Sequence, residues 1–156
     1  MSALAVVAAI RPDSWNFPLL VHVFGAMVLV GGLVTAVSAL AFAKGDTRLL
    51  RLGYWSLLAV GLPGYVIMRI GAQWIYSKEH WDDVPDGLVP SWIDIGYIVA
   101  DAGAVLMIIA LIVGGIGIRQ LPQGKGQGLL KATLVISILI LTAAVVAIWA
   151  MAGKPN

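Results

Sequence analysis

Four long apolar stretches, separated by short polar connections, dominate the chain. They cover residues 17–43, 53–76, 92–118 and 129–152 and contain almost no charged side chains. A helix needs about 20 residues to cross about 30 Å of hydrocarbon, so each stretch is long enough to span a bilayer. Because unpaired backbone groups are costly in lipid, we expect all four stretches to be helical.

The connections and the length of the chain indicate how these helices are arranged. The stretches lack the alternation of apolar and polar positions that marks the strands of a membrane β-barrel. The connections are short and rich in turn-forming residues, which is typical of antiparallel helices that lie side by side. With 156 residues the chain has the length of one domain. The sequence therefore predicts an all-α fold, a single transmembrane four-helix bundle over residues 1–156.

Composition removes most soluble classes of protein. Apolar residues make up 60% of the chain and charged residues 12%, and the mean hydropathy is +0.95. Soluble domains carry about 25% charged residues because their surface must be hydrated, so the expected environment here is a lipid bilayer. The net charge of +2 and the scattered basic residues argue against a nucleic-acid partner. The absence of cysteine excludes disulfides and thiolate metal sites.

Basic residues in the connections predict the orientation. The first connection, 44–51, holds three basic residues and one acid, and the third, 119–131, holds three basic residues and no acid. The second, 77–91, holds one lysine against four acids. Because lysine and arginine in short loops stay on the cytoplasmic side, the first and third connections should face the cytoplasm. Both termini should then be extracytoplasmic, in a multi-pass protein of the cell (cytoplasmic) membrane.

The outer boundary carries a cluster of tryptophans. Trp15, Trp74, Trp81 and Trp92 all fall near it in this orientation, and tryptophan favours the headgroup level of a bilayer. Residues 1–10 are also apolar but too few to span. We expect them to lie at the membrane surface, with a cleaved signal peptide as the alternative.

Three ionisable side chains lie deep inside the expected spans. His22, Arg69 and Asp101 come from three different helices, and a charged group at such a position costs about 2.5–3.5 kcal/mol on insertion scales. At 1.5 Å per residue they lie about 8, 10 and 13 Å below the outer boundary. Because their depths are similar, we expect them to meet in one outward-side polar pocket.

Helical spacing extends this group. Tyr65, Arg69 and Gln73 recur at steps of four on the second span, and Tyr97 and Asp101 do so on the third. Residues at this spacing share one face of a helix. The candidate ligand- or cofactor-binding residues are therefore His22, Tyr65, Arg69, Gln73, Tyr97 and Asp101.

A purely structural interpretation of the same residues also stands. Arg69 and Asp101 can form a buried ion pair that docks two helices, although desolvation offsets much of the attraction in such a pair. Arg69 can instead extend alone toward the headgroups. The ion-pair interpretation and a ligand-binding role are compatible with each other.

Small residues predict where the helices pack closely. Glycines and alanines let membrane helices approach one another, and in the first span they share the face of His22. Pro63 predicts a kink in the second span, because proline removes a backbone hydrogen bond. The fourth span, with few polar groups, is expected to be a structural wall. The small residues taken to mark the packed faces of the first three spans are Gly25, Gly32, Ala36, Ala39, Ala43, Gly61, Gly64, Gly71, Gly103, Ala104 and Gly114.

The chemistry of the site stays open at this point. No serine-histidine-aspartate spacing, phosphate loop or paired-carboxylate motif occurs in the sequence, so no catalytic residue is assigned. His22 and His80, or two copies of His22 across a dimer, can ligate a haem iron axially. A histidine can equally move a proton. The acidic run 79–83 with Asp86 can bind a cation, although a hydrated loop is the simpler interpretation.

One segment resembles known families. LLVHVFGAMVLVGGLVTA, residues 19–36, is similar to the first helix of copper-resistance-D-like bacterial membrane proteins. It is also similar to that of a family of small bacterial integral membrane proteins of unknown function. The stretches LPGYVIMRIGAQWI and WIDIGYIVADAGAVLMIIAL resemble the second of these families, so the likeness covers most of residues 17–119.

The resemblance suggests a cofactor. Some relatives with this helix pattern bind b-type haem through a histidine in the first helix, so by resemblance His22 would be the ligand of a haem iron. This sequence departs from those relatives because it lacks a second histidine within the spans.

Three functions follow as hypotheses. The first is a haem- or quinone-associated redox module, in which His22 is a ligand or proton acceptor, Arg69 holds an anionic group and Asp101 orients Arg69. The second is a non-enzymatic membrane subunit or assembly factor whose small-residue faces bind other membrane proteins. The third is a small-solute or proton transporter, which would require a homo-oligomer because four helices enclose only a narrow path.

Overall fold

The computed structural model describes residues 13–85 and 88–153, and the elements in these ranges are helical. The segment proposed for the membrane surface, residues 1–10, lies outside the described residues. In chain order the elements are η1 (Asp13–Trp15), α2 (Asn16–Phe42), α3 (Thr47–Ser56), η2 (Leu57–Gly61), α4 (Leu62–Lys78), η3 (Trp81–Asp83), α5 (Ser91–Gln120), η4 (Leu121–Gln123) and α6 (Gln127–Gly153).

Four helices in the described ranges are long and apolar enough to cross a membrane. They cover Asp13–Phe42, Thr47–Lys78, Ser91–Gln123 and Gln127–Gly153. The prediction of an all-α fold with four such helices is therefore confirmed for this part of the chain. The second, third and fourth helices extend beyond both ends of their predicted spans, because the polar residues of the connections continue the helical turns. The first begins before its predicted span but ends at Phe42, one residue before the predicted end.

The second helix shows the largest difference from its predicted boundary. It begins at Thr47, whereas the apolar stretch begins at residue 53. Asp46 caps this end, since its side chain accepts a hydrogen bond of 2.7 Å from the backbone N–H of Arg48. Arg48 and Arg51 therefore lie on the first turns of a helix rather than in a loop.

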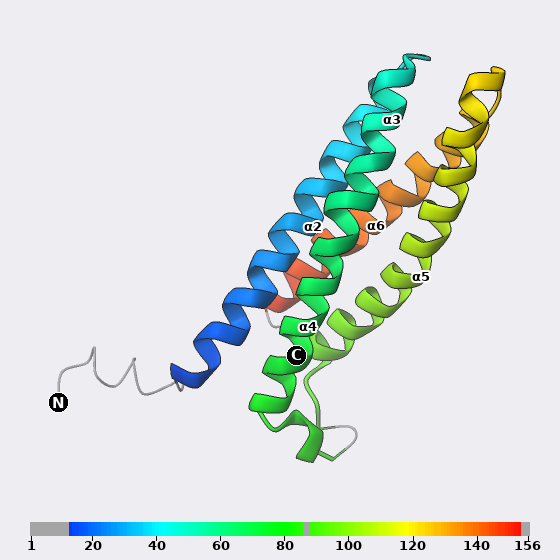
Figure 1. Ribbon diagram of the computed structural model, residues 1–156. Helices are drawn as coiled ribbons and strands as arrows, with labels where there is room; N and C mark the ends of the chain where they lie inside the picture. Colours follow the sequence, from blue (N-terminus) through cyan, green and yellow to red (C-terminus); the bar gives the residue numbers. More distant parts are fainter. Residues whose placement is uncertain (1–12, 86–87, 154–156) are drawn as a thin grey trace.

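The four long helices form two closely packed pairs (Figure 1). α2 packs along α4, α5 packs along α6, and contacts between α2 and α6 join the pairs. α4 and α5, although consecutive in the chain, have little direct contact. The order around the bundle is α4, α2, α6, α5, and the side between α4 and α5 is called here the α4/α5 seam.

Glycines bring α2 and α4 together. A Cβ on Gly32 would lie 2.6 Å from the backbone nitrogen of Gly61, and one on Gly64 would lie 2.9 Å from Cα of Leu29. A Cβ on Gly25 would collide with the backbone of α4 in the same way. These are the close approaches that the small residues predict, because only a missing side chain lets two membrane helices meet backbone to backbone.

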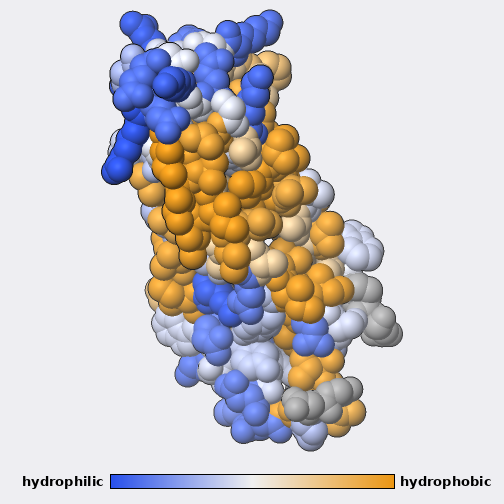
Figure 2. All heavy atoms as spheres, turned by 90° about the vertical axis from the view of Figure 1, so that its right-hand side faces the viewer, coloured by the Kyte–Doolittle hydropathy of each residue, from blue (hydrophilic) through white to orange (hydrophobic). Residues whose placement is uncertain are grey.

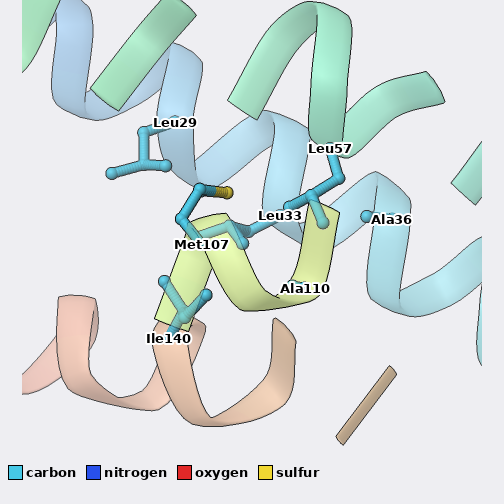
Figure 3. Close-up of a cluster of buried hydrophobic side chains, with 7 residues drawn as sticks. All are labelled: Leu29, Leu33, Ala36, Leu57, Met107, Ala110 and Ile140. Atoms are coloured by element: carbon cyan, nitrogen blue, oxygen red, sulfur yellow. The ribbon is translucent and has the colours of Figure 1, made fainter. Parts of the chain in front are cut away.

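A buried apolar cluster fills the middle of the bundle (Figure 3). Leu33, Leu57 and Met107 are almost fully buried in it and come from three different elements. Its members come from α2, η2, α5 and α6, and partly buried side chains of α4 pack against it, so the cluster joins all the long helices. Its members are Leu29, Leu33, Ala36, Leu57, Met107, Ala110 and Ile140.

α3 and α4 form one continuous helix through a π-helical turn. The turn covers Leu57–Gly61, and at its end the N–H of Leu62 donates to the carbonyl of Leu57, five residues earlier. Pro63 follows immediately and has no N–H to donate. This wider turn directly precedes Pro63, where the sequence predicts a kink.

The surface is divided by polarity. On the face toward which α5 lies, hydrophilic residues gather at the end of the α2–α3 and α5–α6 connections, and a broad hydrophobic surface follows (Figure 2). Large apolar side chains are strongly exposed there and elsewhere, for example Met27 at 69% and Ile98 at 67%. A water-soluble protein rarely exposes so much contiguous apolar surface.

Candidate functional site

His22 of α2 is held against the backbone of α4. A Cβ on Gly71 would lie 2.6 Å from Cα of His22, so the two helices touch at this level. The ring nitrogen Nδ1 of His22 lies 3.0 Å from the carbonyl oxygen of Met68. A carbonyl can only accept a hydrogen bond, so Nδ1 carries the proton in this arrangement.

The other ring nitrogen of His22 is left for a ligand. With the proton on Nδ1, the neutral ring has its lone pair on Nε2. Within the described part of the chain, Nε2 has no hydrogen-bond partner. It is also not fully buried, since Ser137 Oγ is the only buried side-chain nitrogen or oxygen without a partner among the described residues. A backbone carbonyl bound to the far nitrogen is also the usual support of a metal-binding histidine. His22 can therefore accept a hydrogen bond or coordinate an iron.

Two cavities meet at His22. The inner one has a volume of about 100 Å³ and reaches down between the helices to Leu29 and Ile140. The outer one has a volume of about 440 Å³. Trp15, Trp81 and Trp92 are among its lining residues, so three of the predicted boundary tryptophans surround its space. The residues that line both cavities are His22, Ala72, Tyr97 and Met151.

Arg69 of α4 lies at the edge of the inner cavity and is fixed by two groups of α5. Its Nη2 lies 2.9 Å from Oδ1 of Asp101. Its guanidinium carbon lies 4.6 Å from the centre of the Tyr97 ring, within the range of a cation–π contact. The guanidinium has five N–H donors in all, so the ion pair leaves donors for an oxygen atom of a ligand.

Polar side chains bridge the α4/α5 seam. The hydroxyl of Tyr65 donates to the carbonyl of Ala100 at 3.2 Å, and the hydroxyl of Tyr97 donates to Oε1 of Gln73 at 3.4 Å. Together with the ion pair, these contacts join α4 to α5, whereas α2 and α4 are joined by close backbone contacts at glycines. The seam is thus crossed by long side chains rather than closed by packed backbone.

Four of the six residues singled out from the sequence line the inner cavity, namely His22, Tyr65, Arg69 and Tyr97. Gln73 and Asp101 do not line either cavity but contact Tyr97 and Arg69 from outside. The ion pair expected from the sequence is present.

The ion pair is not buried, which differs from the expectation. The side chain of Asp101 is 66% exposed and that of Arg69 is 31% exposed. Gly96, Gly103 and Met107 are buried on α5 and set its inward face. Asp101 lies two residues before Gly103, about 200° around the helix, so the rotation that buries the glycine turns the aspartate outward.

The fourth long helix contributes more than the expected wall. Ala144, Ala147 and Met151 of α6 line the inner cavity, and Met151 lines the outer one as well. Sequence reasoning passed over them because they are neither polar nor charged. The signal was the spacing of small residues three apart, which leaves room beside a helix.

Gly103 also differs from its predicted role. No atom would lie within 4 Å of a Cβ placed on it, so it lines the inner cavity rather than allowing a close helix contact.

The acidic connection after α4 joins the site only in part: Glu79 and Trp81 line the outer cavity, whereas the suggested second haem ligand, His80, lines neither cavity. Nδ1 of His80 lies 3.4 Å from Oδ2 of Asp83, and both side chains are about four-fifths exposed. Among residues 13–85 and 88–153, no three histidine, aspartate or glutamate side chains are grouped so as to hold a metal ion. Asp86, which belongs to the suggested cation site, lies outside the described residues.

No protein-family model, curated protein or solved structure matches this chain.

Proposed function

We propose that the chain is a multi-pass protein of the cytoplasmic membrane that holds a planar redox ligand, of the haem or quinone class, in its extracytoplasmic half. The placement rests on the basic residues near the α2–α3 and α5–α6 connections and the acidic ones near the α4–α5 connection. Both cavities are lined from the half of the bundle that contains the α4–α5 connection.

The observation that carries the ligand proposal is the orientation of His22. Its Nδ1–H is held by the carbonyl of Met68, which directs the Nε2 lone pair to whatever occupies the adjacent space. Nε2 can coordinate a haem iron or accept a hydrogen bond from the hydroxyl of a quinol. In haem the group that would bind Nε2 is the iron at the centre of a flat ring, and in a quinol it is a hydroxyl hydrogen at the edge of one.

The surroundings suit such a ring. The outer cavity, at about 440 Å³, falls in the range of about 300–1,000 Å³ that is typical of small-molecule sites. Tryptophan and tyrosine side chains line it, and aromatic rings favour stacked or edge contacts with a flat ligand. If the ligand were haem, the His22 imidazole and the Met151 thioether, which line the same space, are the side chains that could hold its iron.

Arg69 would bind the polar end of the ligand. Asp101 and Tyr97 hold its guanidinium at the edge of the inner cavity. Its remaining donors suit a propionate of haem or a carbonyl oxygen of a quinone. Asp101 would then act as a positioning residue, since it contacts the arginine and lines neither cavity.

One purification tests the proposal. Protein extracted in mild detergent from haem-replete cells is examined by absorption spectroscopy, and its organic extract is examined for quinones by chromatography with mass spectrometry. A Soret band identifies haem, and a quinone peak near one per chain identifies the other ligand. His22→Ala should lose whichever ligand is bound, because Nε2 is removed.

Two further variants separate ligand loss from misfolding. Gly103→Leu fills the inner cavity without meeting protein atoms near the Cβ and should also reduce ligand content. Gly31→Ala, at a position where a Cβ meets nothing within 4 Å and which lines neither cavity, should retain it. Wild-type protein free of both haem and quinone, or a ligand that persists in His22→Ala, would overturn the proposal.

A further inference from the structure

The Arg69–Asp101 ion pair lies on the outside of the bundle, within the apolar part of its surface. Asp101 is flanked one helical turn away on either side by Ile98 and Val105, which are 67% and 59% exposed. On α4, Val66 and Ile70 beside Arg69 are also exposed, at 46% and 56%. In the membrane placement proposed above, an isolated chain would present this ion pair to lipid, mainly through Asp101, which is 66% exposed.

An ion pair exposed on the apolar surface favours a partner that shields it from lipid. Ionisable groups within the hydrocarbon face the interior of a bundle or a polar partner, because a charge facing lipid costs about 2.5–3.5 kcal/mol or more. Lipid tails provide no donor or acceptor for the free oxygen of Asp101. Arg69 and Asp101 already neutralise each other at 2.9 Å, so the groups left without a partner are the second oxygen of Asp101 and the remaining N–H donors of Arg69. A partner on the α4/α5 seam that offers a cation near Asp101 and an anion near Arg69, at one depth, would bind both.

We infer that a second copy of this chain covers the α4/α5 seam, related to the first by a two-fold axis along the membrane normal. Such an axis keeps each residue at the same depth in both chains and places α4 of one chain opposite α5 of the other. Arg69 on α4 would then face Asp101 of the partner subunit, and Asp101 would face the partner subunit's Arg69. The seam is self-complementary in charge, as an isologous dimer interface requires.

The apolar residues around the pair agree with this occupant. Ile98, Val105 and Ile112 recur every seven residues on α5 and are each more than half exposed, at 67%, 59% and 58%. Residues seven apart occupy the same position of a heptad, so these three form one exposed apolar stripe beside Asp101 that a second helix can cover. Each protomer already offers both charges on one seam, so a copy of the same chain meets the requirement without a specialised partner.

This inference rests on the proposed membrane placement but not on the ligand. Covering the α4/α5 seam would leave the outer cavity, whose lining includes residues near the α4–α5 connection, as the route to His22. A dimer without haem or quinone would support the interface and contradict only the ligand proposal. Sedimentation of the chain with the membrane fraction, measured in the same cells, checks the placement separately.

A charge exchange between two chains tests the contact. Arg69→Asp gives a seam with two carboxylates, and Asp101→Arg gives a seam with two guanidiniums, so the pair within each chain is lost. Each variant alone should repel its own copy, and differently tagged chains should co-purify at less than about a tenth of the wild-type yield. When the two variants are co-expressed, each charge faces its opposite and co-purification should return toward the wild-type level.

Cysteine cross-linking supplies a second measurement on the otherwise intact chain. The sequence contains no cysteine, so a single Val66→Cys, Ile98→Cys or Val105→Cys variant reports only its own contacts. Oxidation in membranes should give a disulfide-linked dimer for at least one of these seam positions. Val145→Cys, on α6 and 56% exposed, is the matched control and should stay monomeric.

The outcomes decide the inference in either direction. Rescue in the mixed charge variants together with seam-specific cross-linking supports it. Wild-type chains that do not co-purify and seam cysteines that do not cross-link would overturn it, as would cross-linking that is strongest through α6. If the charge variants do not accumulate in membranes, the cysteine variants, which keep both charges, still decide.

Discussion

A backbone carbonyl of α4 determines which nitrogen of the His22 imidazole carries the proton. The carbonyl of Met68, 3.0 Å from Nδ1, leaves Nε2 as the nitrogen with the lone pair. This depends on the close approach of α2 and α4, which Gly64 and Gly71 permit at their contacts with Leu29 and His22. The chemistry of one side chain is therefore set by glycines in the neighbouring helix.

A pair of glycine substitutions tests this dependence. Gly64→Ala places a methyl group against the backbone of Leu29, which cannot move without separating the helices. We expect a loss of about 1–3 kcal/mol in stability, as for other overpacked sites, measured as a lower midpoint of thermal unfolding in detergent. Gly31→Ala is the control, because its Cβ meets nothing within 4 Å and alanine favours a helix. If the two variants melted at the same temperature, the contact would not determine the spacing of α2 and α4.

Among the elements, the helix from Thr47 to Lys78 is distinctive because it contains a π-helical turn at Leu57–Gly61. A π turn holds more residues than an α turn, and such turns occur most often as single interruptions of α-helices at functional sites. Here the turn lies just before Pro63 and one face of it is buried, since Leu57 and Gly61 contact the core while Ala59 and Val60 are exposed. It sets the rotation of α4 and thereby the direction in which Arg69 points.

Single-residue deletions test the role of the turn. Removing Ala59, an exposed residue of the π turn, should let the segment close into regular α-helix with α3 and α4 keeping their faces. Removing Ile67, in regular α-helix, rotates everything beyond it by about 100° and displaces Arg69 and Gly71. We expect the Ala59 deletion to accumulate in membranes near the wild-type level and the Ile67 deletion to be lost, as measured by immunoblotting of membrane fractions. Equal loss of both would show that the extra residue is itself needed.

For the whole molecule, orientation is the property on which the proposed roles depend. Six of the ten basic residues lie in or beside the α2–α3 and α5–α6 connections at one end of the bundle, and the acidic connection lies at the other end (Figure 1). With the cavities in the extracytoplasmic half, a ligand would be reached from outside the cytoplasm. With the opposite orientation the same site would face the cytoplasm.

Cysteine labelling of intact cells measures this orientation. Asp82→Cys, in the connection after α4, should react with a membrane-impermeant maleimide, because that connection is expected outside. Lys125→Cys, in the connection between α5 and α6, should react only after the membrane is permeabilised. The cysteine-free sequence gives no background label. The reverse pattern would place both termini in the cytoplasm.

The sequence by itself determined the helices and part of the site. Length and hydropathy are enough to identify a helix that crosses hydrocarbon, because such a helix satisfies its own backbone. Costly side chains such as His22 and Arg69 stand out in that background, and the period of the helix placed Tyr65 and Tyr97 beside them. These are local properties, and for the residues that the structure describes they required no knowledge of how the helices meet.

Only the tertiary structure decided what each of these residues faces. Asp101 and Gly103 lie on opposite sides of α5, and only packing against the other helices selects which side turns inward. The same packing placed Met151 in the lining of the cavities that His22 lines and brought the carbonyl of Met68 to 3.0 Å from Nδ1 of His22. A sequence gives the angle between two residues on one helix, but the rotation of that helix is fixed by contacts with residues far along the chain.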